Sequence, residues 1–297
     1  MNEQTVVSKR RKIFEQRTPA ERVLYFIVFT VFLMFGLFYI YIYVWCFLAA
    51  IKTHNEIVLT PFSIPLLKDW KISNFIEVFG FLKVAGFGYF GMLFNSVYFS
   101  VLGSLIKVSV TSMFAYACTK YKFPGSTLVY PLIMVMLTLP IYGSQGSNYI
   151  IIKRLGLINS YSQIVLAFNG MNMWFLYFTA TFKGVSDSYG EAAVLDGAND
   201  FQVYFKVMLP QALNLWLALF LMSWEADWNA YASVLIYLPK LPTLAGGIYM
   251  FEIDAVQSVR FDMLYAAYFM SAIPPLVIFG FFSNILTNSI SVGGVKE

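Results

Sequence analysis

Three charged residues lie inside otherwise apolar segments of this sequence: Lys107, Glu225 and Asp227. A charge at the centre of a bilayer costs about 2.5–3.5 kcal/mol on insertion scales, so such residues usually face other protein groups or water. Lys107 is about fourteen residues into its segment, roughly 21 Å at 1.5 Å per residue, which makes either surface hard to reach. The two carboxylates point to different sides of a helix. We therefore predict an ion pair between Lys107 and one of them, either purely structural or with a carboxylate that binds substrate.

An aromatic stripe surrounds these carboxylates. Trp224, Trp228 and Tyr231 recur at i, i+4 and i+7, which places them along one side of a helix. Aromatic rings stack on the C–H faces of sugars, and carboxylates and amides form hydrogen bonds with sugar hydroxyls. The stripe either lines a substrate pathway, together with the nearby carboxylates and Asn229, or packs against other helices. Weaker candidates of the same kind lie in the preceding apolar segment: Asn169, Asn172 and Trp174.

The sequence contains no constellation typical of catalysis or metal binding. It has a single histidine, His54, and no cluster of Cys and His with the spacing of a metal site. No Gly-Lys dipeptide occurs, so a phosphate-binding P-loop is absent. We therefore expect no catalytic residue, no metal and no cofactor in this chain.

The composition is that of a polytopic membrane protein. Of 297 residues, 59% are hydrophobic and 12% charged, with a mean hydropathy of +0.67, whereas soluble domains carry about 25% charged residues. The net charge of +4 comes mostly from residues 9–12, Arg17 and Arg22, just before the first apolar segment, so it does not indicate nucleic-acid binding. Under the positive-inside rule this cluster places the N-terminus in the cytoplasm. Cys46 and Cys118 fall in apolar segments and imply no disulfide.

Six apolar segments are long enough to cross a bilayer, which takes roughly 20 residues. The predicted fold is therefore all-α, with both termini cytoplasmic and one membrane domain over residues 23–286, between a basic tail (1–22) and a short inner tail (287–297). Residues 52–92 form an extracytoplasmic segment, and residues 239–262 an outer loop. After Pro140 the third segment becomes polar, so it either breaks beside a cavity or ends early. The predicted spans are 23–51, 93–119, 126–150, 161–182, 211–238 and 263–286.

One polar stretch, residues 184–210 (the polar loop), separates the fourth and fifth spans. Ser186, Asp187 and Ser188 can cap a helix start, where the charge of Glu191 suits the helix dipole. Two alanines then allow another surface to approach closely, and Asp196-Gly197 predicts a sharp turn. Residues 201–209 predict a second short helix that Pro210 closes.

These residues resemble the EAA loop of ABC-importer permeases. The pattern is Glu191-Ala192-Ala193, three residues to Gly197, then Leu209-Pro210. Further stretches resemble carbohydrate-uptake permeases of the MalG type: WKISNF, AYACTKYKFPG, LGLINS, Trp228-Asn229 and the final SVGGVKE. In that family the loop fits into a cleft on a separate ATPase subunit.

The resemblance implies a type I importer permease in the bacterial cytoplasmic membrane. It implies four partners: a second, related permease, two ATPase subunits that bind ATP and Mg, and an extracytoplasmic solute-binding protein. It also implies that residues 191–193, Asp196, Gly197, Leu209 and Pro210 couple to the ATPase. A proline usual before the EAA helix is missing here, and Asn214 replaces a second one, so we expect altered local bends.

The alternative is an ion-coupled secondary carrier that uses Lys107, Glu225 and Asp227. Such carriers usually show two related halves, and none are detectable in this sequence. A carrier would also need no polar loop of this kind.

Overall fold

The computed structural model describes residues 18–139, 143–258 and 260–290, and side chains over 18–139, 143–254 and 260–283. The basic residues 9–12 and Arg17, Pro140 and most of the inner tail lie outside the described residues. The described part is helical, with one isolated β-bridge between Val84 and Phe87. In chain order its elements are α2 (Pro19–Ala50), α3 (His54–Leu59), η1 (Leu67–Asp69), α4 (Ser73–Phe81), α5 (Tyr89–Val97), η2 (Tyr98–Leu102), α6 (Gly103–Lys120), α7 (Ser126–Thr138), α8 (Ser144–Arg154), η3 (Tyr161–Ala167), α9 (Met173–Gly184), α10 (Ser188–Leu195), α11 (Asp200–Val203), η4 (Tyr204–Met208), α12 (Leu209–Gln211), α13 (Leu213–Trp228), α14 (Tyr231–Tyr237), α15 (Leu244–Ser258) and α16 (Phe261–Ile290).

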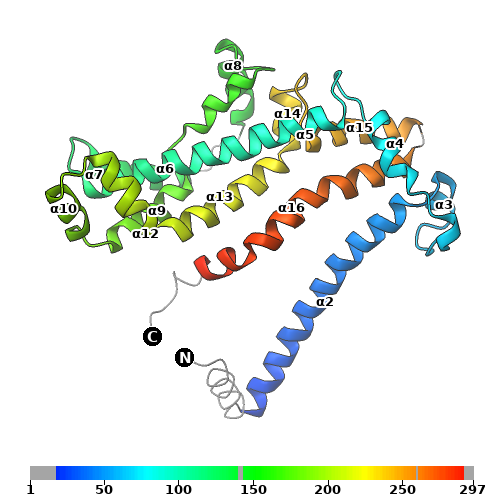
Figure 1. The fold of residues 1–297 in the computed structure, drawn as a ribbon, viewed down its shortest axis with the longest axis horizontal. Helices are drawn as coiled ribbons and strands as arrows, with labels where there is room; N and C mark the ends of the chain where they lie inside the picture. Colours follow the sequence, from blue (N-terminus) through cyan, green and yellow to red (C-terminus); the bar gives the residue numbers. More distant parts are fainter. Residues whose placement is uncertain (1–17, 140–142, 259, 291–297) are drawn as a thin grey trace.

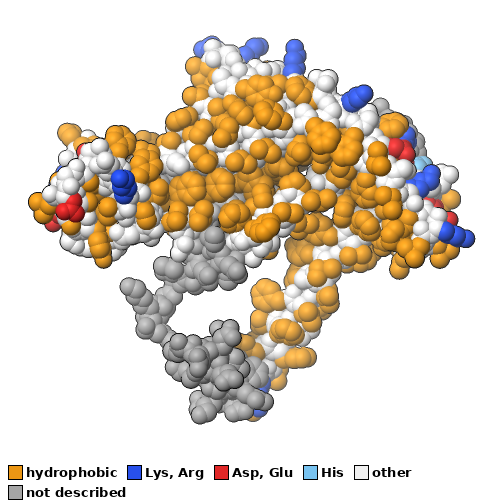
Figure 2. All heavy atoms as spheres, in the orientation of Figure 1, with side chains coloured by type: hydrophobic (Ala, Val, Ile, Leu, Met, Phe, Trp, Pro, Cys, Tyr) orange, Lys and Arg blue, Asp and Glu red, His pale blue; other side chains and the backbone are white. Residues whose placement is uncertain are grey.

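Three helices of the described part are long and apolar enough to cross a membrane: α2, the continuous run of α5, η2 and α6, and residues Phe261–Ser283 of α16. The start of α2 follows from the sequence, because Thr18 and Glu21 form a capping box around Pro19. Along α2 nearly every side chain is apolar and exposed. Hydrophobic side chains cover most of the face in Figure 2, with charged groups towards its edges, as expected for a surface that meets lipid.

The other three predicted spans are not continuous helices, and the break between α7 and α8 is one of the two outcomes that the sequence left open for residues 126–150. Residues 126–150 divide into α7 and α8, and α8 begins after Gly143 in a left-handed conformation with a φ of 77°. Residues 161–182 divide into η3 and α9, whose first turn is capped by Asn172. Residues 211–238 divide into α12, α13 and α14, with the second break at Asn229. Average hydropathy does not register the breaks at Asn172 and Asn229, because local side-chain hydrogen bonds at these residues leave the average polarity unchanged.

The predicted outer loop 239–262 is also wrong, since it contains the helix α15. Two prolines and two glycines occur in this stretch, a composition typical of loops. The helix forms because Thr243 caps it, with Gly246 N–H donating to Thr243 Oγ1 at 3.3 Å. Gly247 then allows the helix to lie directly against Met92 of α5.

Two apolar clusters hold the helices together. The first cluster joins α4, α5, α13, α15 and α16 around Met92, Trp224, Trp228 and Met263. The second cluster joins α6 and α9 to the polar loop around Phe178, Phe182, Tyr204 and Met208. In Figure 1 the polar-loop helix α10 lies at one end of the long helices α6 and α13, and α3 and α4 lie towards the other end. The fold therefore separates the polar loop from residues 52–92.

The close approach of α15 and α5 gives a test of the packing. A β-carbon added at Gly247 would overlap the sulfur of Met92, so we expect Gly247→Ala to destabilise the protein by about 1–3 kcal/mol through overpacking. Gly80→Ala is the matched control, because no heavy atom lies within 4 Å of the added carbon in that helix. The midpoint of thermal unfolding in detergent should fall for the first variant only. Equal midpoints would contradict this packing.

Candidate functional site

The polar loop folds as two helical arms joined by a tight turn. The first arm is α10, and Gly197 follows it with a φ of 85°, the left-handed conformation that the Asp196-Gly197 pair predicts. The second arm runs without interruption through α11, η4 and α12, so Pro210 does not close it. It ends at Ala212, where the chain bends by 82° into α13.

Of the residues expected to cap the start of α10, Ser186 accepts a hydrogen bond from a backbone N–H group and Asp187 does not. Asp187 occupies the N-cap position but makes no capping hydrogen bond there. Ser186 Oγ accepts a hydrogen bond from Ser188 N–H at 3.4 Å. The Asp187 carboxylate instead accepts a hydrogen bond from Lys120 at 2.6 Å. The competing cation explains why the predicted aspartate cap is not formed.

Most residues of the EAA pattern face outward. The exposed members are Glu191, Ala192, Asp196, Gly197 and Pro210. The described part of this chain therefore does not cover the surface that the pattern predicts for docking of the ATPase. The other two pattern residues, Ala193 and Leu209, pack against the second cluster. The sequence did not single out two apolar side chains on the same loop: Leu195, 88% exposed, and Phe201, 66% exposed. Apolar residues of this kind are more often buried, and the fold shows that these two are exposed.

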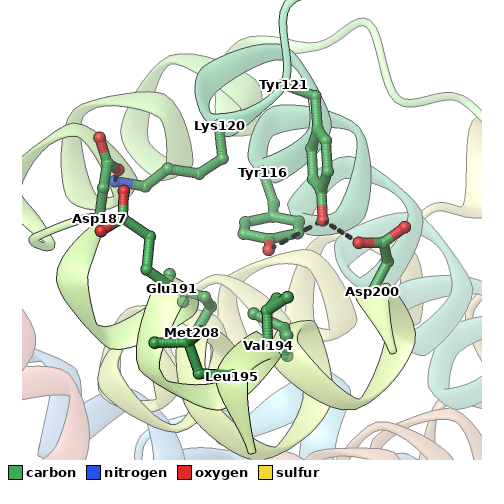
Figure 3. A pocket seen from close by; sticks show the side chains of 11 residues that line it. Tyr116, Lys120, Tyr121, Asp187, Glu191, Val194, Leu195, Asp200 and Met208 are labelled. Atoms are coloured by element: carbon green, nitrogen blue, oxygen red, sulfur yellow. Dashed lines mark hydrogen bonds and ion pairs between the residues drawn. The ribbon is translucent and has the colours of Figure 1, made fainter. Parts of the chain in front are cut away.

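A pocket of about 530 Å³ lies between the polar loop and the end of α6 (Figure 3). Lys120 Nζ donates to Asp187 Oδ1 and to the carbonyl of Val185, each at 2.6 Å. On the other side of the pocket, Tyr121 Oη donates to Asp200 Oδ1 at 2.9 Å (Figure 3). Burial, with the hydrogen bonds to Tyr116 and Asp200, raises the pKa of Tyr121, so this phenol remains a donor. These contacts join residues that are 65 to 79 positions apart in the chain. Local sequence patterns therefore could not predict them.

The intramembrane charges pair selectively. Lys107 Nζ of α6 lies 2.8 Å from Asp227 Oδ2 of α13, and Ser104 Oγ donates to the same oxygen at 3.0 Å. Glu225 points elsewhere, and its Oε1 accepts a hydrogen bond from Asn229 at 2.8 Å. Of the two carboxylates left open by the sequence, Asp227 therefore forms the ion pair. The pair borders a second pocket, of about 270 Å³, between α6, η3 and α14.

The aromatic stripe does not line a common surface. Trp224 and Trp228 are each only 4% exposed and pack within the first cluster, which is the arrangement expected from the helix-packing alternative. Tyr231 begins α14 beyond the break and stacks on Tyr249, with 4.9 Å between ring centroids. The stripe assumed one continuous helix, and the break at Asn229 removes its geometry.

The weaker candidates of the preceding segment have local structural contacts. Asn172 caps α9 through Trp174 N–H, and its amide donates to Thr111 at 2.8 Å. Asn169 Oδ1 accepts a hydrogen bond from Met171 N–H at 3.0 Å. The indole of Trp174 packs against the second cluster. Both asparagines therefore have hydrogen-bond partners within the chain.

Comparison with known proteins gives consistent matches. Residues 107–292 match the family model described as binding-protein-dependent transport system inner membrane component. The chain is 24% identical to a permease protein of a diacetylchitobiose uptake system of Streptomyces coelicolor, over 84% of this chain and 82% of that protein. It is also 24% identical to a permease protein of an arabinooligosaccharide transport system of Bacillus subtilis, over 89% and 93%. A chain of a bacterial ABC transporter involved in the import of alginate shares the fold, with a TM-score of 0.74, 19% identity, and coverage of 90% and 98%.

Proposed function

This chain belongs to the family of binding-protein-dependent transport system inner membrane components, and from that premise we propose that it forms half of the translocation pathway of an ATP-driven importer. Membership of this family makes the chain a multi-pass permease subunit of the cytoplasmic membrane. The ATPase is then a separate polypeptide, and ATP and Mg bind to that partner. A second permease completes the pathway, and an extracytoplasmic binding protein delivers the solute.

The observation that carries this proposal is the exposed turn of the polar loop. Its first arm, α10, has no buried residue, and the tip residues around Gly197 are open. Leu195 and its neighbour Val194, 88% and 56% exposed, form an apolar patch next to the charged residues Glu191 and Asp196, and such a patch is typical of a surface that another protein covers. We assign this surface to the ATPase subunit.

The loop geometry suggests how movement of the ATPase reaches the membrane. The second arm continues directly into α13 through the 82° bend at Ala212. A push on the loop would therefore rotate the start of α13 and, through the second cluster, displace α6 and α9. Closure of two ATPase subunits would in this way switch the cavity between inward-facing and outward-facing states.

The substrate class that we propose is a sugar or an oligosaccharide. The names of two relatives support it, since one belongs to a diacetylchitobiose system and the other to an arabinooligosaccharide system. The pocket beside Lys107 and Asp227 offers charged and hydroxyl-binding groups at membrane depth. Of the residues expected along the pathway, all but Trp224 and Trp228 retain some exposure: Glu225, Asp227, Asn229, Tyr231, Asn169 and Asn172.

Uptake into proteoliposomes separates this function from an ion-coupled carrier. The complex is reconstituted with its binding protein, and uptake of radiolabelled arabinooligosaccharides and diacetylchitobiose is followed with and without enclosed ATP. We expect uptake to require ATP and the binding protein, and to continue when ionophores collapse the proton and sodium gradients. Uptake that continues without ATP and stops with the ionophores would favour the carrier.

A further inference from the structure

Apolar burial alone does not hold α10 in place. No residue of this helix is buried, and it contacts the second cluster through Ala193. Its close approach to the second arm occurs at Gly190, where an added β-carbon would lie 3.1 Å from Met208 Cε. Burial of one alanine stabilises an orientation only weakly, because the hydrophobic contribution scales with buried apolar area. The orientation of the polar loop therefore depends on its polar contacts.

The first polar contact is made by Lys120, the last residue of α6. Its side chain is 11% exposed, whereas the Asp187 side chain is 74% exposed. An ion pair with so exposed a carboxylate contributes little by itself. The same ammonium also donates to the carbonyl of Val185, the C-cap residue of α9, so that it holds the junction between α9 and α10. Loss of this largely buried donor should matter more than loss of the Asp187 charge.

The second polar contact is made by Tyr121, the next residue along the chain. Its hydroxyl donates to Asp200, the first residue of α11, at the beginning of the second arm. A bond from a phenol to a carboxylate is charge-assisted and therefore stronger than a neutral one. Two adjacent residues, Lys120 at the end of α6 and its C-cap Tyr121, thus contact both arms of the polar loop. Their contacts lie on opposite sides of the pocket in Figure 3.

We propose that Lys120 and Tyr121 are positioning residues for coupling, which fix both arms of the polar loop to the end of α6. This inference rests on the proposed function. From Lys107 to Lys120 the helix rises roughly 20 Å at 1.5 Å per residue. At the Lys107 end α6 is joined to the last turn of α13 by the ion pair with Asp227. The loop, α6 and α13 therefore form a closed frame, and a displaced loop carries both helices with it.

The test uses the complete transporter in proteoliposomes, with radiolabelled arabinooligosaccharides as substrate. Lys120→Met keeps the apolar stem and removes the donor, and Tyr121→Phe removes one oxygen atom. The measured quantity is substrate imported per ATP hydrolysed, together with the amount of ATPase that copurifies. We expect import per ATP to fall about fivefold in Tyr121→Phe, as for the loss of one hydrogen bond, and further in Lys120→Met, which loses two, with the ATPase still bound in both. Lys120→Arg should restore it, and Asp187→Asn should have a smaller effect.

The matched controls are Lys122→Met and Tyr130→Phe, which change exposed side chains without these hydrogen bonds. Wild-type import per ATP in a Lys120→Met/Tyr121→Phe double variant would overturn the proposal. If Lys120→Met does not reach the membrane, Tyr121→Phe decides alone, and unchanged coupling in it overturns the proposal equally. Failure of the proposed function would look different, because uptake by the wild-type protein would then continue without ATP and stop with the ionophores.

Discussion

Gly197→Asp should abolish binding of the ATPase and reduce import to background while the membrane domain remains folded. The residue has a φ of 85°, and no heavy atom lies within 4 Å of an added β-carbon. The folded chain therefore has room for the side chain, and the backbone strain is about 1–2 kcal/mol, least for Asn and Asp. The new carboxylate instead stands on the exposed tip beside Asp196, where a partner must approach closely. Copurification of the ATPase and uptake are the two measurements.

Gly125→Asp separates strain from docking. Gly125 has a φ of 89°, also has open space around its added carbon, and lies in the turn after α6, outside the polar loop. Both variants introduce the same side chain at a glycine with nearly the same positive φ. We expect Gly125→Asp to bind the ATPase and import at the wild-type level. If Gly197→Asp behaves like this control, the polar loop is not the docking surface.

The polar loop was predictable because its signals are local. An Asp-Gly pair requires a left-handed residue wherever it forms a tight turn, and Gly197 adopts that conformation. The depth of Lys107 within an apolar segment likewise required a partner, and Asp227 is one of the two that the sequence offered. Both inferences rest on properties of single residues and their neighbours, which tertiary contacts do not reverse.

The remaining features depend on contacts between distant segments. Helical spacing places Trp224 and Trp228 on one side of α13 but does not specify whether α5 and α15 cover that side. The helix breaks at Asn172 and Asn229 arise from capping and local hydrogen bonds, to which average hydropathy is blind. The contacts of Lys120 with Val185 and Asp187 require knowing that α6 and α9 lie side by side. For such features the sequence identifies the residues, but only the fold shows which of them are in contact.

Lys107→Met should lower the amount of assembled permease severalfold, because it leaves the Asp227 carboxylate without its cation. Removing one partner of a fully buried ion pair costs about 3–5 kcal/mol. Here the side chains are 28% and 30% exposed, so solvent reduces the cost below that range. Glu225→Gln is the matched control, because this carboxylate is exposed and accepts its hydrogen bond from Asn229. Assembly is measured as the yield of complex after detergent extraction, and equal yields for Lys107→Met and the wild type would show that the pair contributes nothing to it.

Neutralising both partners distinguishes a structural role of the ion pair from a role in transport. In a Lys107→Met/Asp227→Asn variant no charge is left uncompensated, and the oxygen of the new amide would still accept the hydrogen bond that Ser104 donates to Asp227. If the pair only joins α6 to α13, assembly recovers, since replacing both ions by neutral groups is often harmless. ATP-dependent uptake should then recover with it. If these charges carry coupling ions or bind the solute, the double variant assembles but does not transport. If the yield recovers and uptake does not, Asp227 has a role in transport itself and does not serve only to join α6 to α13.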